Sequence, residues 1–403
     1  MHRNFSAFYE AFSHTLFFFL AATGFLFIVL KSYDYFLIKK EAQARKGMGD
    51  FSSYGEWKDA VREKCLEWAR DMPQVQISDN MNFVMLEKIS GRYSKDVLQA
   101  WQKGGILLGL GHYLKSRPDD PKTAGISKYL LEEVFNSDHD WKAHPGHIDY
   151  AILAYALMKL PDYNPKYNKA MDRVMEVILD HLGEDGTVCY RKDIENYRLV
   201  DTIGMICPFL IRYGVMNNKQ EPIDLAIRQI EKYSRYGVHA GTNIPAHAYH
   251  VKNKVPMGIF GWGRGVGWYA LGLIDSYEEL TRDHPKKGYL RKNIALLAES
   301  LIKFQRPDGG WGHSFFMDDN IYDSSATSMA LYFLKKSLMN NIISGEVYIK
   351  ALDKGMLMLE RSTRKDGTVD YSQGDTKGIG TYSTLFREMP FTQGIVLALL
   401  EMT

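Results

Sequence analysis

Two aspartates stand alone in apolar stretches of the chain, each where a helix is expected to begin. Asp149 lies in His147-Ile-Asp-Tyr-Ala-Ile-Leu, and Asp201 lies in Val200-Asp-Thr-Ile-Gly-Met-Ile. Two carboxyl groups in one poorly solvated pocket have pKa values that move apart, which leaves one of them protonated near neutral pH and able to act as an acid. Aspartate is also a preferred helix N-cap. Each residue is therefore a candidate for catalysis or, alternatively, a structural cap.

A second candidate site lies in Gly261-Trp-Gly-Arg-Gly-Val-Gly-Trp268. The indole faces of Trp262 and Trp268 can stack on sugar rings, and the fork of Arg264 can bind a planar carboxylate through two parallel hydrogen bonds. The glycines would let the backbone approach a ligand closely. The segment therefore predicts a site for an acidic sugar. The alternative is a glycine-rich turn before a buried helix, because residues 269–277 continue apolar.

The elements that must position these residues are helices. Apolar clusters recur along the chain, for example at residues 107–114 and 152–157, and they are typical of buried helix faces. Three Asp-Gly pairs, which begin at residues 185, 308 and 366, each precede an extended stretch, a polar loop and another helix.

The spacing of these pairs indicates a repeat. The last two pairs lie 58 residues apart, and the first lies 123 residues, about twice that distance, before them. A repeat on this scale indicates stacked helical hairpins, and residues 51–403 hold six of them. We therefore expect an all-α (α/α)6 barrel whose site lies on the face of the Asp-Gly loops, with an α-solenoid as the alternative. Successive hairpins would also bring Asp149 and Asp201 together.

The N-terminal part of the chain is expected to lie outside the barrel. Residues 11–30 contain no Asp, Glu, Lys or Arg, and twenty such residues match the length that a helix needs to cross a bilayer. A cleaved signal peptide is the alternative, but the only nearby Ala-x-Ala, at residues 42–44, lies well beyond the run. We therefore expect residues 1–50 to form a single-pass membrane anchor and tether, and residues 51–403 to form the barrel.

The distribution of charge bears on orientation and on partners. Basic residues after the apolar run outnumber Arg3 and the α-amino group before it, so the positive-inside rule favours a cytoplasmic barrel; they are Lys31, Lys39, Lys40, Arg45 and Lys46. The whole chain has a net charge of +2 with scattered basic residues. It lacks the concentrated basic face of a nucleic-acid-binding protein, and we expect no such partner.

Six short motifs follow one another in an order that resembles a known family. They are His147-Ile-Asp149, Asp201-Thr-Ile-Gly-Met, Pro245-Ala-His247-Ala-Tyr249, Trp262-Gly-Arg264-Gly-Val-Gly-Trp268, Asp323-Ser-Ser-Ala-Thr-Ser-Met and Pro390-Phe-Thr-Gln-Gly. Together they resemble the motifs of the unsaturated uronyl hydrolases of glycoside hydrolase families 88 and 105, over roughly residues 55 to 400. The resemblance implies an (α/α)6 barrel, in agreement with the repeat.

The resemblance also implies a chemistry and a set of roles. Such enzymes add water across the C4–C5 double bond of an unsaturated uronic acid, and the resulting hemiketal opens and releases the next sugar. Asp201 would be the acid/base, and Asp149 would orient the ring hydroxyls and help to set the pKa of Asp201. The uronate and its developing charge would face His247 and Arg264. The sugar would pack against two indoles, those of Trp262 and Trp268.

The implied partner is an unsaturated uronide oligosaccharide, which we expect to be of rhamnogalacturonan type. No metal or organic cofactor is implied. Two other functions stay open at this point: another (α/α)6 carbohydrate enzyme, such as a conventional glycosidase or an epimerase, and a membrane-tethered glycan-binding protein without turnover. The presence of both aspartates favours the hydrolase.

Overall fold

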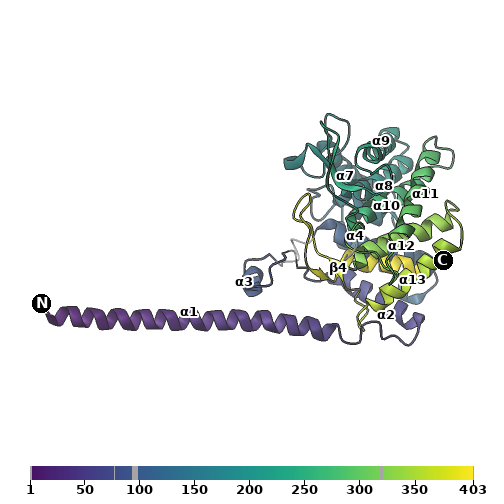
Figure 1. Ribbon diagram of the computed structural model, residues 1–403. Helices are drawn as coiled ribbons and strands as arrows, with labels where there is room; N and C mark the ends of the chain where they lie inside the picture. Colours follow the sequence, from purple (N-terminus) through teal and green to yellow (C-terminus); the bar gives the residue numbers. More distant parts are fainter. Residues whose placement is uncertain (1, 77, 93–98, 318–320, 403) are drawn as a thin grey trace.

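The computed structural model describes residues 2–76, 78–92, 99–317 and 321–402, and within them the chain has two parts, a helical barrel and a long N-terminal helix (Figure 1). Six outer helices of the barrel alternate along the chain with six inner ones. The outer helices are α2 Tyr54–Arg70, α5 Ile126–Val134, α7 Asn168–Asp180, α9 Gln220–Tyr236, α11 Lys287–Lys303 and α13 Glu346–Arg361. The inner helices are α4 Ala100–Ser116, α6 Tyr150–Met158, α8 Asp201–Met216, α10 Gly263–Glu279, α12 Ser324–Met339 and α14 Pro390–Glu401.

The inner helices form a closed ring. Each one packs against the next along the chain, and the last, α14, returns to pack against the first, α4. The predicted (α/α)6 barrel is therefore confirmed. The α-solenoid alternative is wrong, because a solenoid leaves its first and last repeats apart.

Glycines allow this closure. A Cβ atom on Gly394 of α14 would lie 1.9 Å from the carbonyl oxygen of Gly105 in α4, and one on Gly109 would lie 2.2 Å from the carbonyl oxygen of Gly394. Any larger residue at these positions would push the two helices apart. The ring therefore closes only because its first and last inner helices contact each other at glycines, which have no side chain.

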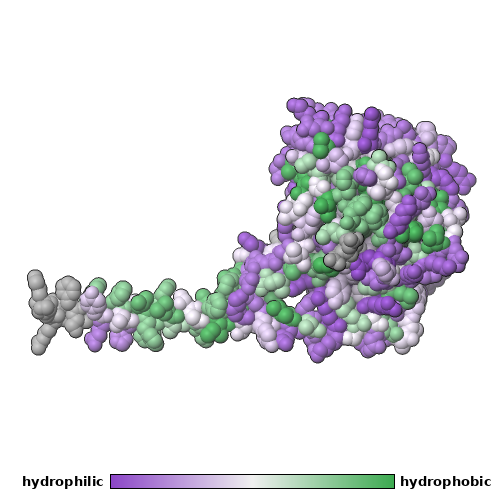
Figure 2. All heavy atoms as spheres, in the orientation of Figure 1, coloured by the Kyte–Doolittle hydropathy of each residue, from purple (hydrophilic) through white to green (hydrophobic). Residues whose placement is uncertain are grey.

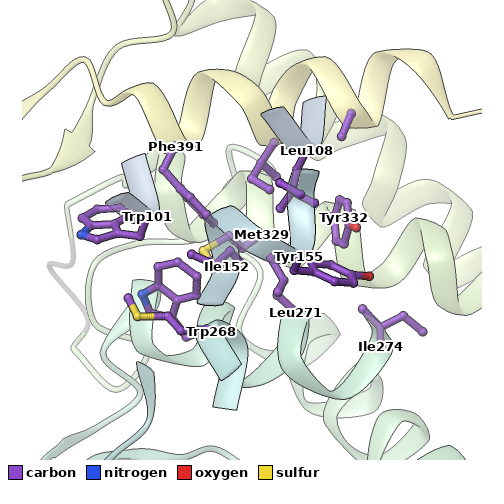
Figure 3. Close-up of a cluster of buried hydrophobic side chains, with 14 of the residues drawn as sticks. Trp101, Leu108, Ile152, Tyr155, Trp268, Leu271, Ile274, Met329, Tyr332 and Phe391 are labelled. Carbon is purple, nitrogen blue, oxygen red and sulfur yellow. The ribbon is translucent and has the colours of Figure 1, made fainter. Parts of the chain in front are cut away.

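The interior of the barrel is a single apolar core. Trp101 and Leu108 of α4, Ile152 of α6, Leu271 of α10 and Met329 of α12 converge in it (Figure 3). Each of these side chains is at most 4% exposed. Burial on this scale is the main stabilising contribution to a barrel of this size, and it fixes the relative positions of the inner helices.

Short strands lie at the N-terminal ends of the inner helices. Strands β1 Tyr197–Leu199, β2 Ala246–His250 and β3 Val255–Phe260 form an antiparallel sheet in that order, and β4 Ser372–Gln373 pairs with β5 Phe386–Arg387. β1 leads into α8, β3 leads into α10, and β5 leads into α14. The connections before the inner helices therefore gather at one end of the barrel, which is the face expected to carry the site.

The N-terminal helix, α1, extends from His2 to Ala44. Its 43 residues make it about 65 Å long at ~1.5 Å per residue, about twice the ~30 Å thickness of a bilayer core. Its apolar part projects away from the barrel as a rod (Figures 1 and 2), and its length and hydropathy are sufficient for it to cross a membrane.

The other end of α1 is fixed to the barrel. Arg45 donates two hydrogen bonds to the carboxylate of Asp370, at 2.9 and 3.0 Å, and Arg364 donates one to Glu41 at 2.9 Å. Asp370 is completely buried. The polar stretch at residues 40–47, which is part of the predicted tether, is therefore helical as far as Ala44 and held in place, because Glu41 and Arg45 have partners on the barrel.

Candidate active site

Asp201 begins the inner helix α8 directly after strand β1. Its side chain is buried, and the N-cap of α8 is Val200, so Asp201 is the first residue of the helix and not its cap. Among the described residues its Oδ2 atom has no hydrogen-bond partner. Burial raises the pKa of Asp201 to about 7, and Asp375 adds to the rise, although the residue's own backbone N–H and the charge of Arg264 oppose it. The carboxyl group is therefore poised to give and take a proton near neutral pH.

His247 lies beside Asp201 because strand β2 pairs with β1. Its Nε2 atom is 3.8 Å from Oδ2 of Asp201, and in the described part of the chain Nε2 has no hydrogen-bond partner. The Nδ1 atom accepts a hydrogen bond from the backbone N–H of Gly380 at 3.4 Å, which leaves the ring proton on Nε2. Burial, assisted by the charge of Arg264, lowers the pKa of His247 to about 4. At neutral pH an uncharged N–H donor therefore faces the same space as the Asp201 carboxyl.

An irregularity in the sheet fixes the position of His247. The pairing of β2 with β3 shifts register around residue 247, and Gly258 on β3 has a φ of +74°. A Cβ atom on Gly258 would lie 2.8 Å from Cβ of His247 and 3.1 Å from the hydroxyl of Tyr382. This is a β-bulge that needs glycine both for its backbone conformation and for space.

Arg264 and Trp262 lie on the other side of His247. The indole of Trp262 is 4.6 Å from the His247 ring between centroids, and its Nε1 donates to Oε1 of Gln373 at 2.9 Å. Arg264 donates from Nη1 to the carbonyl of Gln373 and from Nη2 to that of Gly374. Its fork therefore binds backbone oxygens, whereas the sequence indicated a fork for a carboxylate. Its role in this geometry is a buried, fixed positive charge beside Asp201 and His247.

Trp268 belongs to the core and not to the site. It is 1% exposed, and its ring lies 4.6 Å from that of Phe391 and 5.8 Å from that of Trp101 (Figure 3). This position does not fit the predicted packing of Trp268 on a sugar. The glycines of the motif also serve helix packing, since a Cβ atom on Gly267 would lie 2.6 Å from the sulfur of Met329.

Asp149 lies just before α6 and is 3% exposed. It makes no capping hydrogen bond, and its Oδ1 atom is without a partner among the residues the structure describes. Burial raises the pKa of Asp149, against the charges of Arg191 and His147. Burial raises the pKa of Tyr190, and the charges of Asp149 and Asp201 raise it further. Tyr190 is therefore a neighbour of both aspartates.

With this geometry in view, comparisons with known proteins decide the family. Residues 72–402 match the model of glycosyl hydrolase family 88. The chain belongs to this family. The resemblance drawn from the six motifs is confirmed, and the protein is a glycoside hydrolase.

Solved structures share the fold of this family 88 hydrolase. One from Klebsiella pneumoniae, described as a possible member of the GH105 family, has a TM-score of 0.72 at 16% identity, over 87% of this chain and 93% of that one. The unsaturated glucuronyl hydrolase of Bacillus sp. GL1 has a TM-score of 0.60 at 16% identity, over 86% and 94%. The 24.9 kDa protein in the picA locus of Rhizobium radiobacter is 27% identical over 161 residues, which is 37% of this chain and 67% of that protein.

Strand β4 of the hydrolase and the loop between β4 and β5 supply site residues that the motifs did not indicate. In β4, Gln373 accepts a hydrogen bond from Trp262. In the loop, Asp375 adds to the raised pKa of Asp201, and the ring of Tyr382 lies 5.4 Å from that of Trp262. The helical repeat could have indicated these residues. Every connection that precedes an inner helix reaches the same end of the barrel, so the polar residues before α14 are candidates for the site as well.

Proposed function

We propose that the protein hydrolyses unsaturated uronyl oligosaccharides, of rhamnogalacturonan type, by hydration of the C4–C5 double bond of the terminal unsaturated uronic acid. The observation that carries the proposal is a pair of buried atoms in the site, Oδ2 of Asp201 and Nε2 of His247. Neither has a hydrogen-bond partner among the described residues, and they lie 3.8 Å apart. The raised pKa of Asp201 supports an acid that is available near neutral pH.

The reaction needs one carboxyl group that works in both directions. The protonated carboxyl of Asp201 gives its proton to C4, and a water oxygen forms a bond to C5. The proton that this water loses returns to the Asp201 carboxylate, so the acid is restored. The product is a hemiketal at C5, which opens at the ring oxygen and leaves a hemiacetal at C1 that releases the next sugar.

The neighbouring residues assist at separate points of this step. The Nε2–H of His247 donates to an oxygen that also contacts Asp201, either of the water or of the uronate. The charge of Arg264 stabilises the uronate and the carboxylate that forms on Asp201, because buried charges act strongly over short distances. Trp262 is the indole of the motif that borders this space. Asp149 orients the hydroxyl groups of the ring through its unpartnered oxygen.

The N-terminal helix determines where in the cell we propose that the enzyme acts. The apolar part of α1 anchors the protein as a single span, and the excess of Lys and Arg after residue 30 favours a barrel on the cytoplasmic side. A cleaved signal segment is the alternative. It predicts a mature chain that lacks the apolar part of α1 and is therefore not held at a membrane by it.

A substrate panel tests the proposal. Disaccharides made by lyases from rhamnogalacturonan and from glycosaminoglycans are incubated with the full-length protein, and the loss of ultraviolet absorbance of the conjugated double bond is followed. We expect the loss with the rhamnogalacturonan product. Asp201→Asn should lower the rate about 10²–10⁴-fold, whereas Asp138→Asn, on the exposed surface of the barrel, should not change it.

Two outcomes contradict the proposal in different ways. Release of sugar without loss of the double bond indicates a conventional glycosidase. Activity of Asp201→Asn within a few-fold of wild type removes Asp201 from the acid/base role.

A further inference from the structure

A cavity lies where α1 meets the mouth of the barrel. Its volume is about 370 Å³, within the roughly 300–1,000 Å³ of small-molecule sites. One wall comes from the last turns of α1, with Leu37, Lys40 and Ala44, and a second from the short helix α3, Val84–Ile89. A third wall comes from the loop between β4 and β5. The cavity is therefore bounded jointly by the N-terminal helix and the enzyme.

The walls of this cavity are held in register by specific contacts. The carboxylate of Asp34 in α1 accepts hydrogen bonds from the backbone N–H groups of Phe83 and Val84, at 2.8 and 3.0 Å. Asp34 is itself 5% exposed. Together with the Arg45–Asp370 pair, this contact fixes α1 on both sides of the cavity, so the cavity is a built feature and not a gap beside a tether.

The cavity adjoins the catalytic end of the barrel. Asp375 lines it and lies near enough to Asp201 to affect its protonation. Gly374 also lines it, and its carbonyl oxygen accepts a hydrogen bond from Arg264 at 2.8 Å. Sugar units that continue from a ring held at Asp201 would therefore enter this space past the β4–β5 loop.

The lining of the cavity suits an acidic sugar chain. The side-chain amide of Gln74 lines it, and amides both donate to and accept from hydroxyl groups. The carboxylates of the lining have partners of their own: Asp375 accepts from Gln99 at 3.2 Å, and Glu388 accepts from Arg364 at 3.0 Å. Lys40 supplies an ammonium group that makes no hydrogen bond or ion pair with any described residue. The neighbouring Glu41, by contrast, is bound to Arg364 at 2.9 Å.

We propose that this cavity is a subsite for the part of the oligosaccharide beyond the bond that is broken, and that Lys40 of α1 binds an acidic group on it. The proposal rests on the proposed function. The matched family model begins at residue 72, so the wall that carries Lys40 lies outside the region common to the family. The N-terminal helix thus forms part of the substrate site and is more than an anchor.

The experiment compares chain lengths in the full-length protein. An unsaturated disaccharide and an unsaturated tetrasaccharide with a second uronate are prepared with the same lyase. Lys40→Ala should lower the ratio of kcat/KM for the tetrasaccharide to that for the disaccharide about two- to fivefold, the range expected for one exposed charge pair. Lys39→Ala is the matched control. Lys39 lies next along the helix, over the ring of Tyr35 at 5.2 Å, and should leave the ratio unchanged.

Binding measured by calorimetry in an Asp201→Asn background separates this proposal from the function. A loss of tetrasaccharide affinity on Lys40→Ala supports the subsite even if the wild type shows no turnover, an outcome that refutes only the proposed reaction. Equal affinities with and without Lys40 refute the subsite, whatever the turnover. A variant that loses only its association with anionic vesicles, with the tetrasaccharide ratio unchanged, assigns the cavity to a lipid headgroup and also refutes the subsite.

Discussion

Replacement of Asp201 by asparagine should make the protein less active and, at neutral pH, more stable. Burial raises the pKa of Asp201 from 3.8 to about 7, which is a shift of about three pH units. One unit corresponds to about 1.4 kcal/mol, so an ionised Asp201 costs the folded state about 4 kcal/mol at most. Asparagine has nearly the same shape and no charge, so it removes this cost.

The sign and the pH range follow from proton binding. Below pH 4 the carboxyl group is protonated in both the folded and the unfolded chain, and the pKa difference has no effect. Between pH 4 and pH 7 only the folded chain keeps the proton, so the stability of the wild type falls as the pH rises. Above pH 7 the cost is complete. The advantage of Asp201→Asn should therefore grow by about 3 kcal/mol between pH 5 and pH 8.

The assay is denaturant unfolding of both proteins at pH 5 and pH 8. Glu279→Gln is the control with the opposite sign. Burial works to raise the pKa of Glu279, but Lys159 and Arg212 outweigh it and hold that pKa at about 2. Its stabilising effect is complete above pH 4.5, so the difference between Glu279→Gln and wild type should not change from pH 5 to pH 8. A difference that is also constant for Asp201→Asn would show that Asp201 is ionised throughout, and the acid role would be refuted.

Three further variants test the framework around the site. Gly258→Ala strains a positive φ and drives a Cβ into His247, so kcat should fall at least tenfold and the unfolding temperature should fall as well; unchanged kcat in the folded variant would show that the bulge does not position His247. Trp268→Ala should cost about 3–5 kcal/mol of unfolding free energy, measured with denaturant, and a stable variant with weakened sugar binding would return Trp268 to the site. Arg45→Met should cost about 1.5–3 kcal/mol and expose residues 31–50 to limited proteolysis, because the buried Asp370 loses two hydrogen bonds; an unchanged cleavage pattern would mean that α1 is not held there.

The fold was predictable because the chain repeats. The Asp-Gly pairs recur at intervals of 58 and 123 residues, which are about one and two repeats, and the number of hairpins follows from the length of the chain. The position of Asp201 was also predictable, since an isolated acid at the start of an apolar helix has few positions available to it. The raised pKa of Asp201 does not come from the expected coupling to Asp149. Burial is the main cause, and the neighbouring carboxylate that adds to it is Asp375.

Other features depend on contacts between distant segments, so the local sequence pattern could not predict them. Trp262 and Trp268 share one motif and lie six residues apart at the start of a helix. The first packs against His247, whereas the second packs in the core. Arg264 has the residue type of a carboxylate ligand, but the backbone of Gly374, 110 residues later, takes one end of its fork. A polar stretch such as residues 40–47 is typical of a tether until its partners in the segment after α13, Arg364 and Asp370, are known.

Three of the buried polar atoms that lack a partner among the described residues lie at the candidate site, and they cost the fold stability. Buried polar atoms are nearly always hydrogen-bonded, and one left without a partner costs about 1–3 kcal/mol. Asp149, Asp201 and His247 each hold such an atom within the described residues, and all three lie at the end of the barrel where the loops converge. A flexible site would relieve this cost by rotating the side chains toward one another or toward solvent. The closed ring, with α4 against α14 through bare backbone, and the bulge behind His247 prevent that relief. The same rigidity that keeps these groups unsatisfied keeps them directed at one space, which is the condition for a substrate to satisfy them.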